Sequence, residues 1–345
     1  MRYEIRAATT ADQAQLYRLA EHLDSVNLPH DAAEIAEILE TSEASFSGAI
    51  ADARKRRFVF VLRDLQEGVA VGTSMVIAQL GSRDAPYVFF DVRNEERYSA
   101  SVDKHFIQEV LTIGYSFHGP TEIGGLVVHP EYRKDPKRLG MLISYVRFLF
   151  LATHREQFQP RVLAELMPPL EPDGTSHLWE AVGRHFTGMT YRAADRLSKK
   201  NKEFISGLFP RGDIYTSLLP PQAQAVIGEV GPQTRGVEKM LTRIGFRYWR
   251  RVDPFDGGPH FIAPTDEIEL VQRTSRRRLI AGTPEGESAR RCLIARIDER
   301  PPWFRAVAAR ATLHPEHPEQ ILVERSALDH LDLQDGDIAP VLPLF

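Results

Sequence analysis

Hydrophobic positions near the start of the chain change from a strand period to a helical period. Residues 2–7 read as a short strand, and Thr10 with Gln13 has the spacing of a capping box that begins a helix. The apolar residues that follow recur at i, i+3, i+4 and i+7, which is typical of the core-facing side of a helix. They are Leu16, Leu19, Ala20 and Leu23. A second helix is predicted over residues 31–46.

The middle of the chain predicts a β–loop–α–β unit. Two apolar runs, at residues 58–62 and 68–80, are typical of strands, whereas residues 83–120 are mixed and predict no clear element. A strand at 123–128 then leads through a charged loop to an amphipathic helix at 140–153. The next strand, residues 162–166, ends at Pro168-Pro169.

The remaining pattern is first helical and then rich in short strands. Helices are predicted at residues 176–186, 201–208, 221–228 and 234–244, and a strand at 247–252. From about residue 267, short apolar runs alternate with turn residues, which indicates a small β-rich domain. We therefore predict two domains, residues 1–265 with a helical insertion at about 168–230, and residues 266–345.

Composition and charge exclude several classes of function. The chain of 345 residues has a net charge of −4, which gives no general attraction for nucleic acid or an anionic membrane. One cysteine, Cys292, allows neither an internal disulfide framework nor a cysteine-based zinc cage, and no metal is expected. The first residues lack the apolar core of a signal peptide, and no apolar run is long enough to span a bilayer. A soluble cytoplasmic protein is expected.

The loop before the helix at 140–153 is the most informative segment. Free backbone N–H groups and the positive end of the helix dipole favour an anion at a helix N-terminus. The loop adds four cations beside Gly140, a combination that suits a pyrophosphate or a 3′-phosphorylated nucleotide. The cations are Arg133, Lys134, Lys137 and Arg138. A solvated basic loop in front of a structural helix is an equally weighted interpretation.

Ordered blocks along the chain resemble one family of enzymes. The strand, basic loop and helix are similar in order to the GNAT acyltransferases, whose loop R/Q-x-x-G-x-G/A holds the pyrophosphate of acyl-CoA. The more specific resemblance is to the arginine N-succinyltransferases, from near the N-terminus to residue 275, and the tail is similar too. It rests on LPHDAAEIAEIL (28–39), FVFVLRD (58–64), LVVHPEYRK (126–134), RFLFLATHREQF (147–158), VLAEL (162–166), LWEAVGRHFTGMTYRAAD (178–195), NKEFISGLFPRGDIYTSLLPPQAQAVIGEV (201–230) and GFRYWRRVDPFDGGP (245–259).

The resemblance implies a fold and a reaction. The fold is α+β, a GNAT-like mixed sheet flanked by helices. The reaction transfers succinyl from succinyl-CoA to the α-amino group of L-arginine in bacterial arginine catabolism. Acyl-CoA is then a co-substrate, no cofactor stays bound, and the chain assembles with copies of itself or with a related subunit. The acyl-CoA site comprises Leu126, Val127, Val128, Arg133, Lys134, Lys137, Arg138 and Gly140.

Two segments depart from the family pattern. The family loop R-x-G-G-N-G is here about two residues longer, and it contains Asp135 and Pro136, which add a negative charge and remove an N–H group. The family's proton-donor histidine lies in I-G-Q-V-H-P-x-T, where this chain has Gly231. Water, Glu229 or His185 are the alternatives for that role. A general acid or base contributes about 10²–10⁴-fold, so its absence need not abolish turnover.

Recognition of arginine requires carboxylates for the guanidinium group. The candidates inside the family-like blocks are Glu165, Asp195, Asp253 and Asp256, although surface charges or structural hydrogen bonds are the more common roles for acidic residues. Trp179, Trp249 and Phe255 are predicted to be core or interface aromatics. The first functional hypothesis is an active N-acyltransferase. The second is a catalytically weak paralogue that serves as a structural or regulatory partner of an active relative, which Gly231 and the altered loop favour.

Overall fold

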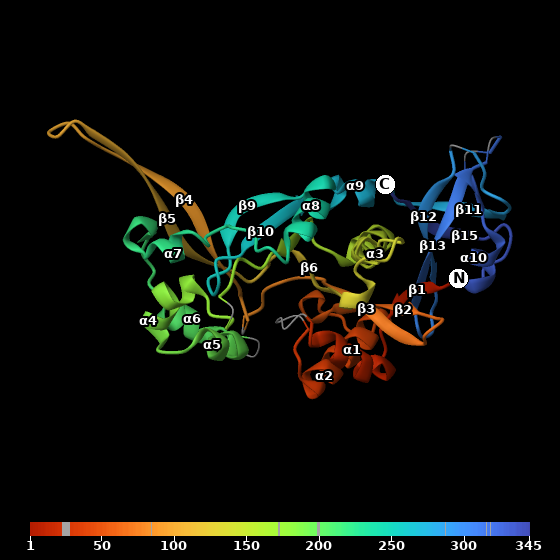
Figure 1. Cartoon of the computed structure of the whole chain (residues 1–345), viewed down its shortest axis with the longest axis horizontal. Coiled ribbons are helices and arrows are strands. Elements are labelled where there is room, and N and C mark those ends of the chain that lie inside the picture. Colours follow the sequence, from red (N-terminus) through yellow and green to blue (C-terminus); the bar gives the residue numbers. More distant parts are fainter. Residues whose placement is uncertain are drawn as a thin grey trace. The chain divides into compact units, whose positions relative to one another are not determined.

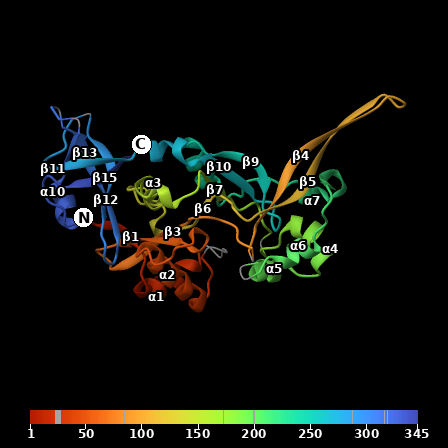
Figure 2. The same ribbon diagram turned by 180° about the vertical axis from the view of Figure 1, so that it is seen from behind.

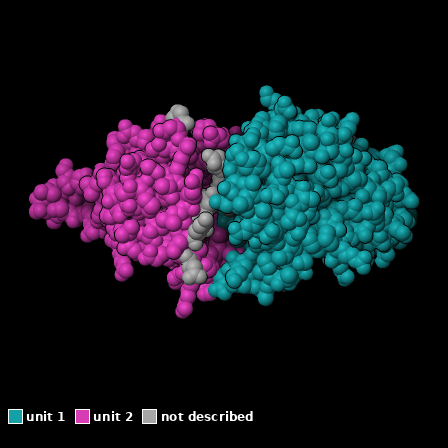
Figure 3. Space-filling model, turned by 90° about the horizontal axis from the view of Figure 1, so that it is seen from below, with its two compact units in different colours: residues 1–78, 121–160, 265–345 teal, residues 79–120, 161–264 magenta. Residues whose placement is uncertain are grey.

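The structure is a computed structural model of the whole chain, and it describes residues 1–22, 28–83, 85–171, 173–198, 201–286, 288–314, 316–317 and 319–345. Two compact units are present (Figure 3). Unit 1 contains residues 1–78, 121–160 and 265–345, and unit 2 contains residues 79–120 and 161–264.

The N-terminal elements of unit 1 agree closely with the sequence pattern. They are β1 (Tyr3–Ala7), α1 (Gln13–Ala20) and α2 (Ala32–Phe46). The predicted capping box is wrong by one residue, because the pair is Thr9 and Asp12. The Asp12 carboxylate accepts from the N–H of Thr9 at 2.8 Å, in a 3₁₀ turn that leads into α1. Arg6 of β1 forms an ion pair with the Asp12 carboxylate at 2.7 Å and so helps to hold it in this position. Leu23, predicted for the apolar stripe of α1, lies outside the described residues.

A central sheet with helices on both faces follows in unit 1. Its further members are β2 (Arg57–Asp64), β3 (Val69–Ile77), β6 (Thr121–Val128) and α3 (Leu139–Thr153). The neighbouring strands pair antiparallel in the order β1, β2, β3, β6. Ser74 of β3 donates from its Oγ to the carbonyl of Ile143 in α3 at 2.7 Å, whereas Met75 packs in a core with α1 and α2. The helices α1 and α2 therefore cover one face and α3 the other (Figures 1 and 2).

The C-terminal strands of unit 1 close into a small barrel. They are β11 (Ser275–Ala281), β12 (Arg290–Ile297), β13 (Phe304–Leu313), β14 (Gln320–Val323) and β15 (Ile338–Pro343). The order β12, β15, β11, β14, β13 closes because β12 also pairs with β13. Two short helices, α9 (Glu269–Arg273) and α10 (Arg325–His330), accompany the barrel.

The two compact units are not the two consecutive stretches of the chain that the sequence predicted, because each is built from separate segments. A unit boundary does fall between Pro264 and Thr265, next to the predicted domain boundary. The segment after it nevertheless groups with the N-terminal residues, because β13 pairs antiparallel with β1 through Ile5 and Ala306.

Unit 2 contains the segment 83–120 that the sequence left unassigned. It forms a long hairpin of β4 (Tyr87–Ser99) and β5 (Lys104–Ser116), which extends away from the helices of this unit (Figure 1). The other strands are β7 (Arg161–Glu165), β8 (Ile214–Tyr215), β9 (Arg247–Val252) and β10 (Pro259–Pro264). They pair in the order β7, β10, β9, β4, β5, β8.

Unit 2 has several short helical elements. They are a π-helical turn (Trp179–Gly183), α4 (Arg184–Thr187), α5 (Tyr191–Ser198), α6 (Glu203–Leu208), α7 (Pro221–Gln224) and α8 (Arg235–Arg243). The π-helical turn, α5 and α6 contribute to one hydrophobic core. Trp179 is fully buried and stacks on Phe255 with ring centroids 5.1 Å apart. Both are core residues, as predicted. The mixture of helices with a mixed sheet confirms the α+β class.

Candidate functional site

The basic loop leads into an uncapped helix N-terminus in unit 1. Arg138 occupies the N-cap of α3 with φ of 49°, and its side chain makes no capping hydrogen bond to the first turn of the helix. In the part of the chain that the structure describes, no ion pair involves Lys134, Lys137 or Arg138. Side-chain charge and the positive end of the helix dipole therefore coincide here, which is the arrangement that binds a phosphate group.

Both carboxylate oxygens of Asp135 accept hydrogen bonds from groups outside the first turn of α3. Its Oδ2 accepts from the Tyr3 hydroxyl at 2.6 Å, and its Oδ1 accepts from the N–H of Lys137 at 2.7 Å. Burial and the neighbouring Asp135 raise the pKa of Tyr3 above its ordinary value, so the phenol remains a donor. The sequence suggested that Asp135 places a negative charge among the phosphates. The structure instead uses this carboxylate to fix the loop.

A second contact to the loop comes from the C-terminal barrel. Arg291 of β12 donates from Nη1 to the carbonyl of Lys137 at 2.8 Å. Burial lowers the pKa of Arg291, and the nearby Asp135 partly offsets that effect. Sequence reasoning missed both Tyr3 and Arg291, because each lies more than a hundred positions from the loop and in an ordinary strand pattern.

The strand before the loop contains a bulge. Thr73 pairs with Val127 and Met75 with Gly124, so β6 carries one extra residue at Gly125 and Leu126. Gly125 has φ of 56°, which favours glycine. Arg147 of α3 is buried and its Nη1 lies 3.5 Å from the Gly124 carbonyl.

The predicted residues of this strand have different environments. Val127 belongs to the core with α1 and α2, while Leu126 is only half-buried. Val128 lies beside Gly140, where an added Cβ atom would be 3.9 Å from its methyl group. The Val128 carbonyl accepts from Arg133 Nε at 3.0 Å, so one loop cation is held along the strand. The structure thus brings the predicted acyl-CoA residues together around the N-terminus of α3.

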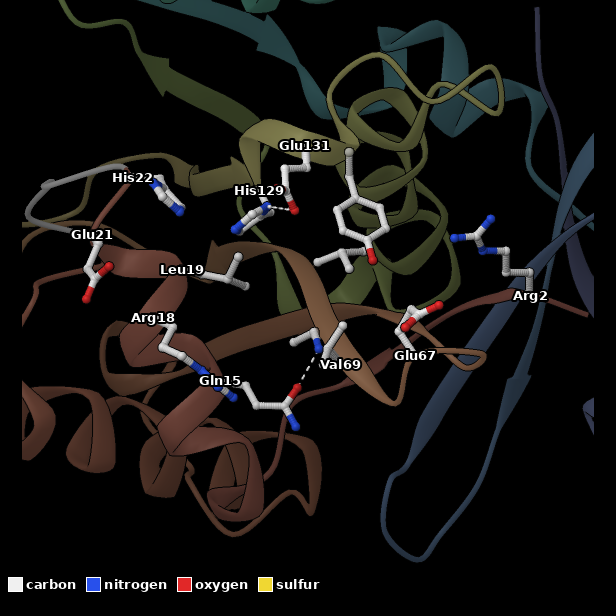
Figure 4. A pocket seen from close by; sticks show the side chains of 13 residues that line it. Arg2, Gln15, Arg18, Leu19, Glu21, His22, Glu67, Val69, His129 and Glu131 are labelled. Carbon is white, nitrogen blue, oxygen red and sulfur yellow. Dashed lines mark hydrogen bonds and ion pairs between the residues drawn. The ribbon is translucent and has the colours of Figure 1, made fainter.

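A pocket of about 520 Å³ opens at the end of β6 (Figure 4). Residues of α1 and the turn after it, of β3 and of the turn after β6 line it, among them Arg18, His22, His129 and Tyr132. The rings of His22 and His129 meet edge to face with centroids 4.9 Å apart. Both charge signs are present, since Glu21, Glu67 and Glu131 also line the pocket. The pocket is polar and adjoins the first residues of the basic loop.

The four predicted carboxylates gather in unit 2. Glu165 ends β7, and one of its oxygens lies within 4.8 Å of one from Asp253. Burial raises the pKa of Asp256, and the nearby Asp253 and Asp195 raise it further. Burial also raises the pKa of Asp253. Both carboxylates also accept hydrogen bonds from the backbone. Asp253 accepts from the N–H of Phe255 and Asp256 from the N–H of Gly258, each at 2.7 Å.

A buried histidine completes this group and was missed by sequence reasoning. His260 of β10 is fully buried and stands opposite Glu165 in the β7–β10 register. Its Nδ1 lies 2.6 Å from the Tyr87 hydroxyl. Burial lowers the pKa of His260 to about 3, so the ring is neutral. The only sequence signal was one histidine in an otherwise apolar strand, which usually indicates a satisfied core residue.

The position of the family's proton donor has no room for a side chain. The N–H of Gly231 donates to the Met167 carbonyl at 2.9 Å, directly after β7. A Cβ atom at Gly231 would lie 2.6 Å from the Pro168 carbonyl oxygen. The backbone has therefore adapted to glycine. The suggested substitutes, Glu229 and His185, are both exposed to solvent.

Comparisons with known proteins agree along most of the chain. A family profile described as "Arginine N-succinyltransferase beta subunit" matches residues 3–270. Arginine N-succinyltransferases of Salmonella paratyphi B and Salmonella typhimurium are each 31% identical over 336 residues, which cover 96% of this chain and 95% of the relative. The structure of arginine/ornithine succinyltransferase subunit AI from Pseudomonas aeruginosa superposes with a TM-score of 0.83 at 28% identity, covering 99% of this chain and 98% of that one.

Proposed function

The chain belongs to the arginine N-succinyltransferase family, and we propose that it transfers the succinyl group of succinyl-CoA to the α-amino group of arginine. Acyl-CoA is a co-substrate in this proposal and leaves as free CoA. The described residues contain no helix that is both long and apolar enough to cross a membrane. A cytoplasmic location is part of the proposal, since succinyl-CoA is an intracellular metabolite.

The observation that carries the proposal is the N-terminus of α3, which has no side-chain cap, beside Lys134, Lys137 and Arg138, for which the described residues show no ion pair. Phosphate oxygens of CoA would accept from the N–H groups at Leu139 and Gly140, with Arg133, Lys134, Lys137 and Arg138 neutralising their charge. Because Asp135 is bonded to Tyr3 and to the Lys137 N–H, its carboxylate does not compete for those donors.

The reaction requires three events. The neutral α-amine attacks the thioester carbonyl carbon, the resulting oxyanion is stabilised, and the C–S bond breaks to release CoA thiolate. The amine loses one proton, and the thiolate gains one. The bulged strand at Leu126–Val128 is the proposed backbone contact for the thioester and pantetheine. Water, Glu229 or His185 is the proposed proton carrier, because Gly231 supplies none.

We propose that the acidic residues of unit 2 bind the guanidinium group of the acceptor arginine. Asp195 lies close enough to Asp256 to raise its pKa, and a cation between them would relieve that repulsion. We assign the guanidinium to Asp195 and Asp256, because Glu165 and Asp253 converge on His260.

The test is release of CoA thiol from succinyl-CoA with arginine as acceptor. The wild-type chain should release thiol only when both substrates are present. The triple variant Arg133→Ala, Lys137→Ala, Arg138→Ala should lose CoA binding in a calorimetric titration. A matched triple variant of exposed cations elsewhere, Lys55→Ala, Lys104→Ala, Arg276→Ala, should bind normally. Silence across a panel of acyl-CoA thioesters and amino acids would reject the enzymatic proposal.

The lack of room for a side chain at Gly231 favours a second function. A chain without room for the family's histidine could act as the partner of an active relative, in an assembly of identical or related subunits. This hypothesis predicts an inactive purified chain that forms a stable complex with an active family member. Good activity in isolation, together with no complex in size-exclusion chromatography, would remove it.

A further inference from the structure

An unsatisfied nitrogen lies in the acidic group of unit 2. His260 is 0% exposed, yet its Nε2 has no hydrogen-bond partner among the described residues. It points toward Glu165, whose Oε1 lies 3.5 Å away, and Asp253 completes the group. One ligand atom from each of the three residues lies within 4.8 Å of the other two. A buried nitrogen without a partner is costly, and it therefore indicates an absent ligand.

The three side chains are held by rigid backbone. Glu165 and His260 are paired residues of β7 and β10. Asp253 follows β9 in a turn closed by its own N–H, which donates to the Gly258 carbonyl at 2.9 Å. The Asp253 carboxylate is oriented by the Phe255 N–H, which occupies Oδ1 at 2.7 Å. Backbone hydrogen bonds and strand pairing thus hold the three side chains in place.

The distance between His260 Nε2 and Glu165 Oε1 is close to that between two neighbouring ligand atoms on one metal ion. Metal–ligand bonds of about 2.1 Å in a tetrahedral zinc site place neighbouring ligand atoms about 3.4 Å apart. The measured separation of 3.5 Å agrees with that value and is long for a charged hydrogen bond. One imidazole with two carboxylates suits zinc and similar divalent transition metals.

Tyr87 supplies the outer contact that such a histidine needs. When Nδ1–H donates to the Tyr87 oxygen, the lone pair of Nε2 is directed at Glu165 and Asp253. Glu165 keeps about a third of its side chain exposed, with 34% accessible, so an ion and its water can enter from solvent.

We propose that Glu165, Asp253 and His260 form a mononuclear site for a divalent transition metal of the zinc class. The site clamps the ends of β7 and β10 to the turn after β9, next to the carbonyl of Met167 that binds Gly231. It stands on its own geometry and does not depend on the acyltransfer reaction.

The test is calorimetric titration of the full chain with Zn²⁺ after dialysis against a chelator, and Co²⁺ absorption as a second readout. One equivalent should bind, and His260→Asn should weaken binding by about 100-fold or more while keeping a polar partner for Tyr87. Glu165→Gln, at the open edge of the site, should weaken it similarly without unfolding the chain. Tyr87→Phe should cost about 10–100-fold.

The control is the exposed pair of His177 and Glu171, whose side chains lie 2.7 Å apart. His177→Asn should leave the stoichiometry and affinity unchanged. Absence of one-equivalent binding, or equal binding by wild type and His260→Asn, would overturn the metal site. Binding of arginine but not of metal, lost in Glu165→Gln, would overturn it too and place the acceptor there. Neither measurement involves acyl-CoA, so failure of the metal site and failure of the acyltransferase remain distinguishable.

Discussion

The Tyr3 hydroxyl donates to the Asp135 carboxylate at 2.6 Å and so ties the first strand to the loop before α3. Without this bond, the carboxylate could turn toward the helix N-terminus and occupy the donors that a phosphate requires. A residue at the start of the chain therefore determines whether the inserted Asp135 supports or blocks anion binding.

Tyr3→Phe should lower the free energy of unfolding by about 1.5–3 kcal/mol, the usual contribution of a hydrogen bond to a charged group. It should also weaken CoA binding, because Asp135 then keeps only its hydrogen bond from the Lys137 N–H and its carboxylate is less firmly oriented. Urea unfolding and titration with CoA measure the two effects. Tyr98→Phe is the matched control, since the Tyr98 hydroxyl donates to Asp103 at 3.2 Å but its side chain is 65% exposed. Equal effects of both substitutions would contradict the proposed role of Tyr3.

Arg291→Ala should raise the dissociation constant for CoA by about 2–10-fold, because one hydrogen bond of ~0.5–1.5 kcal/mol to the Lys137 carbonyl is lost. The change should act on the loop and not on the barrel. Arg310→Ala, on the exposed side of β13, is the control and should bind CoA normally. CoA affinity that stays at the wild-type value in Arg291→Ala would show that the loop does not need this contact.

Gly231→His should not restore a proton donor. The new Cβ atom would lie 2.6 Å from the Pro168 carbonyl oxygen, so the backbone must move, and overpacking of this kind costs about 1–3 kcal/mol. Thermal unfolding and the thiol-release assay test this directly. Gly236→His is the control, because no atom lies within 4 Å of an added Cβ there. A gain in turnover without loss of stability in Gly231→His would refute the steric argument.

The buried His260 predicts a pH effect on the metal-free chain. Burial holds its pKa at about 3 in the folded state, below the ordinary value near 6.5, so the unfolded chain binds the proton more readily. The contribution of His260 to the free energy of unfolding is therefore fully present above pH 6.5. It decreases as the pH falls toward 3, with a slope from this group of at most ~1.4 kcal/mol per pH unit. Urea unfolding in the presence of a chelator should show a smaller slope for His260→Asn. His177→Asn should leave the slope unchanged, and an unchanged slope in His260→Asn would show that the ring is not buried neutral.

Periodicity predicted the regular elements well wherever one face of an element is buried. Helix α2, with Asp31 accepting from two N–H groups of its first turn, follows the predicted bounds within one residue. The hairpin β4–β5 was missed because its outer half is exposed on both sides. Exposed apolar residues such as Tyr98, Phe106 and Ile107 do not alternate with a buried set there.

The sequence by itself determined the basic loop before a helix and the family resemblance, because each depends on residues adjacent along the chain, and the resemblance in turn implied the α+β class. Tertiary structure alone decided that Asp135 turns to Tyr3, that Arg291 reaches the loop, and that His260 meets Glu165 and Asp253. These contacts join residues far apart in the chain, and their formation depends on strand register. A shift of one residue in the β7–β10 pairing would turn His260 to the opposite face of the sheet. Local patterns cannot specify that register, because it is fixed by packing and turn geometry across the whole unit.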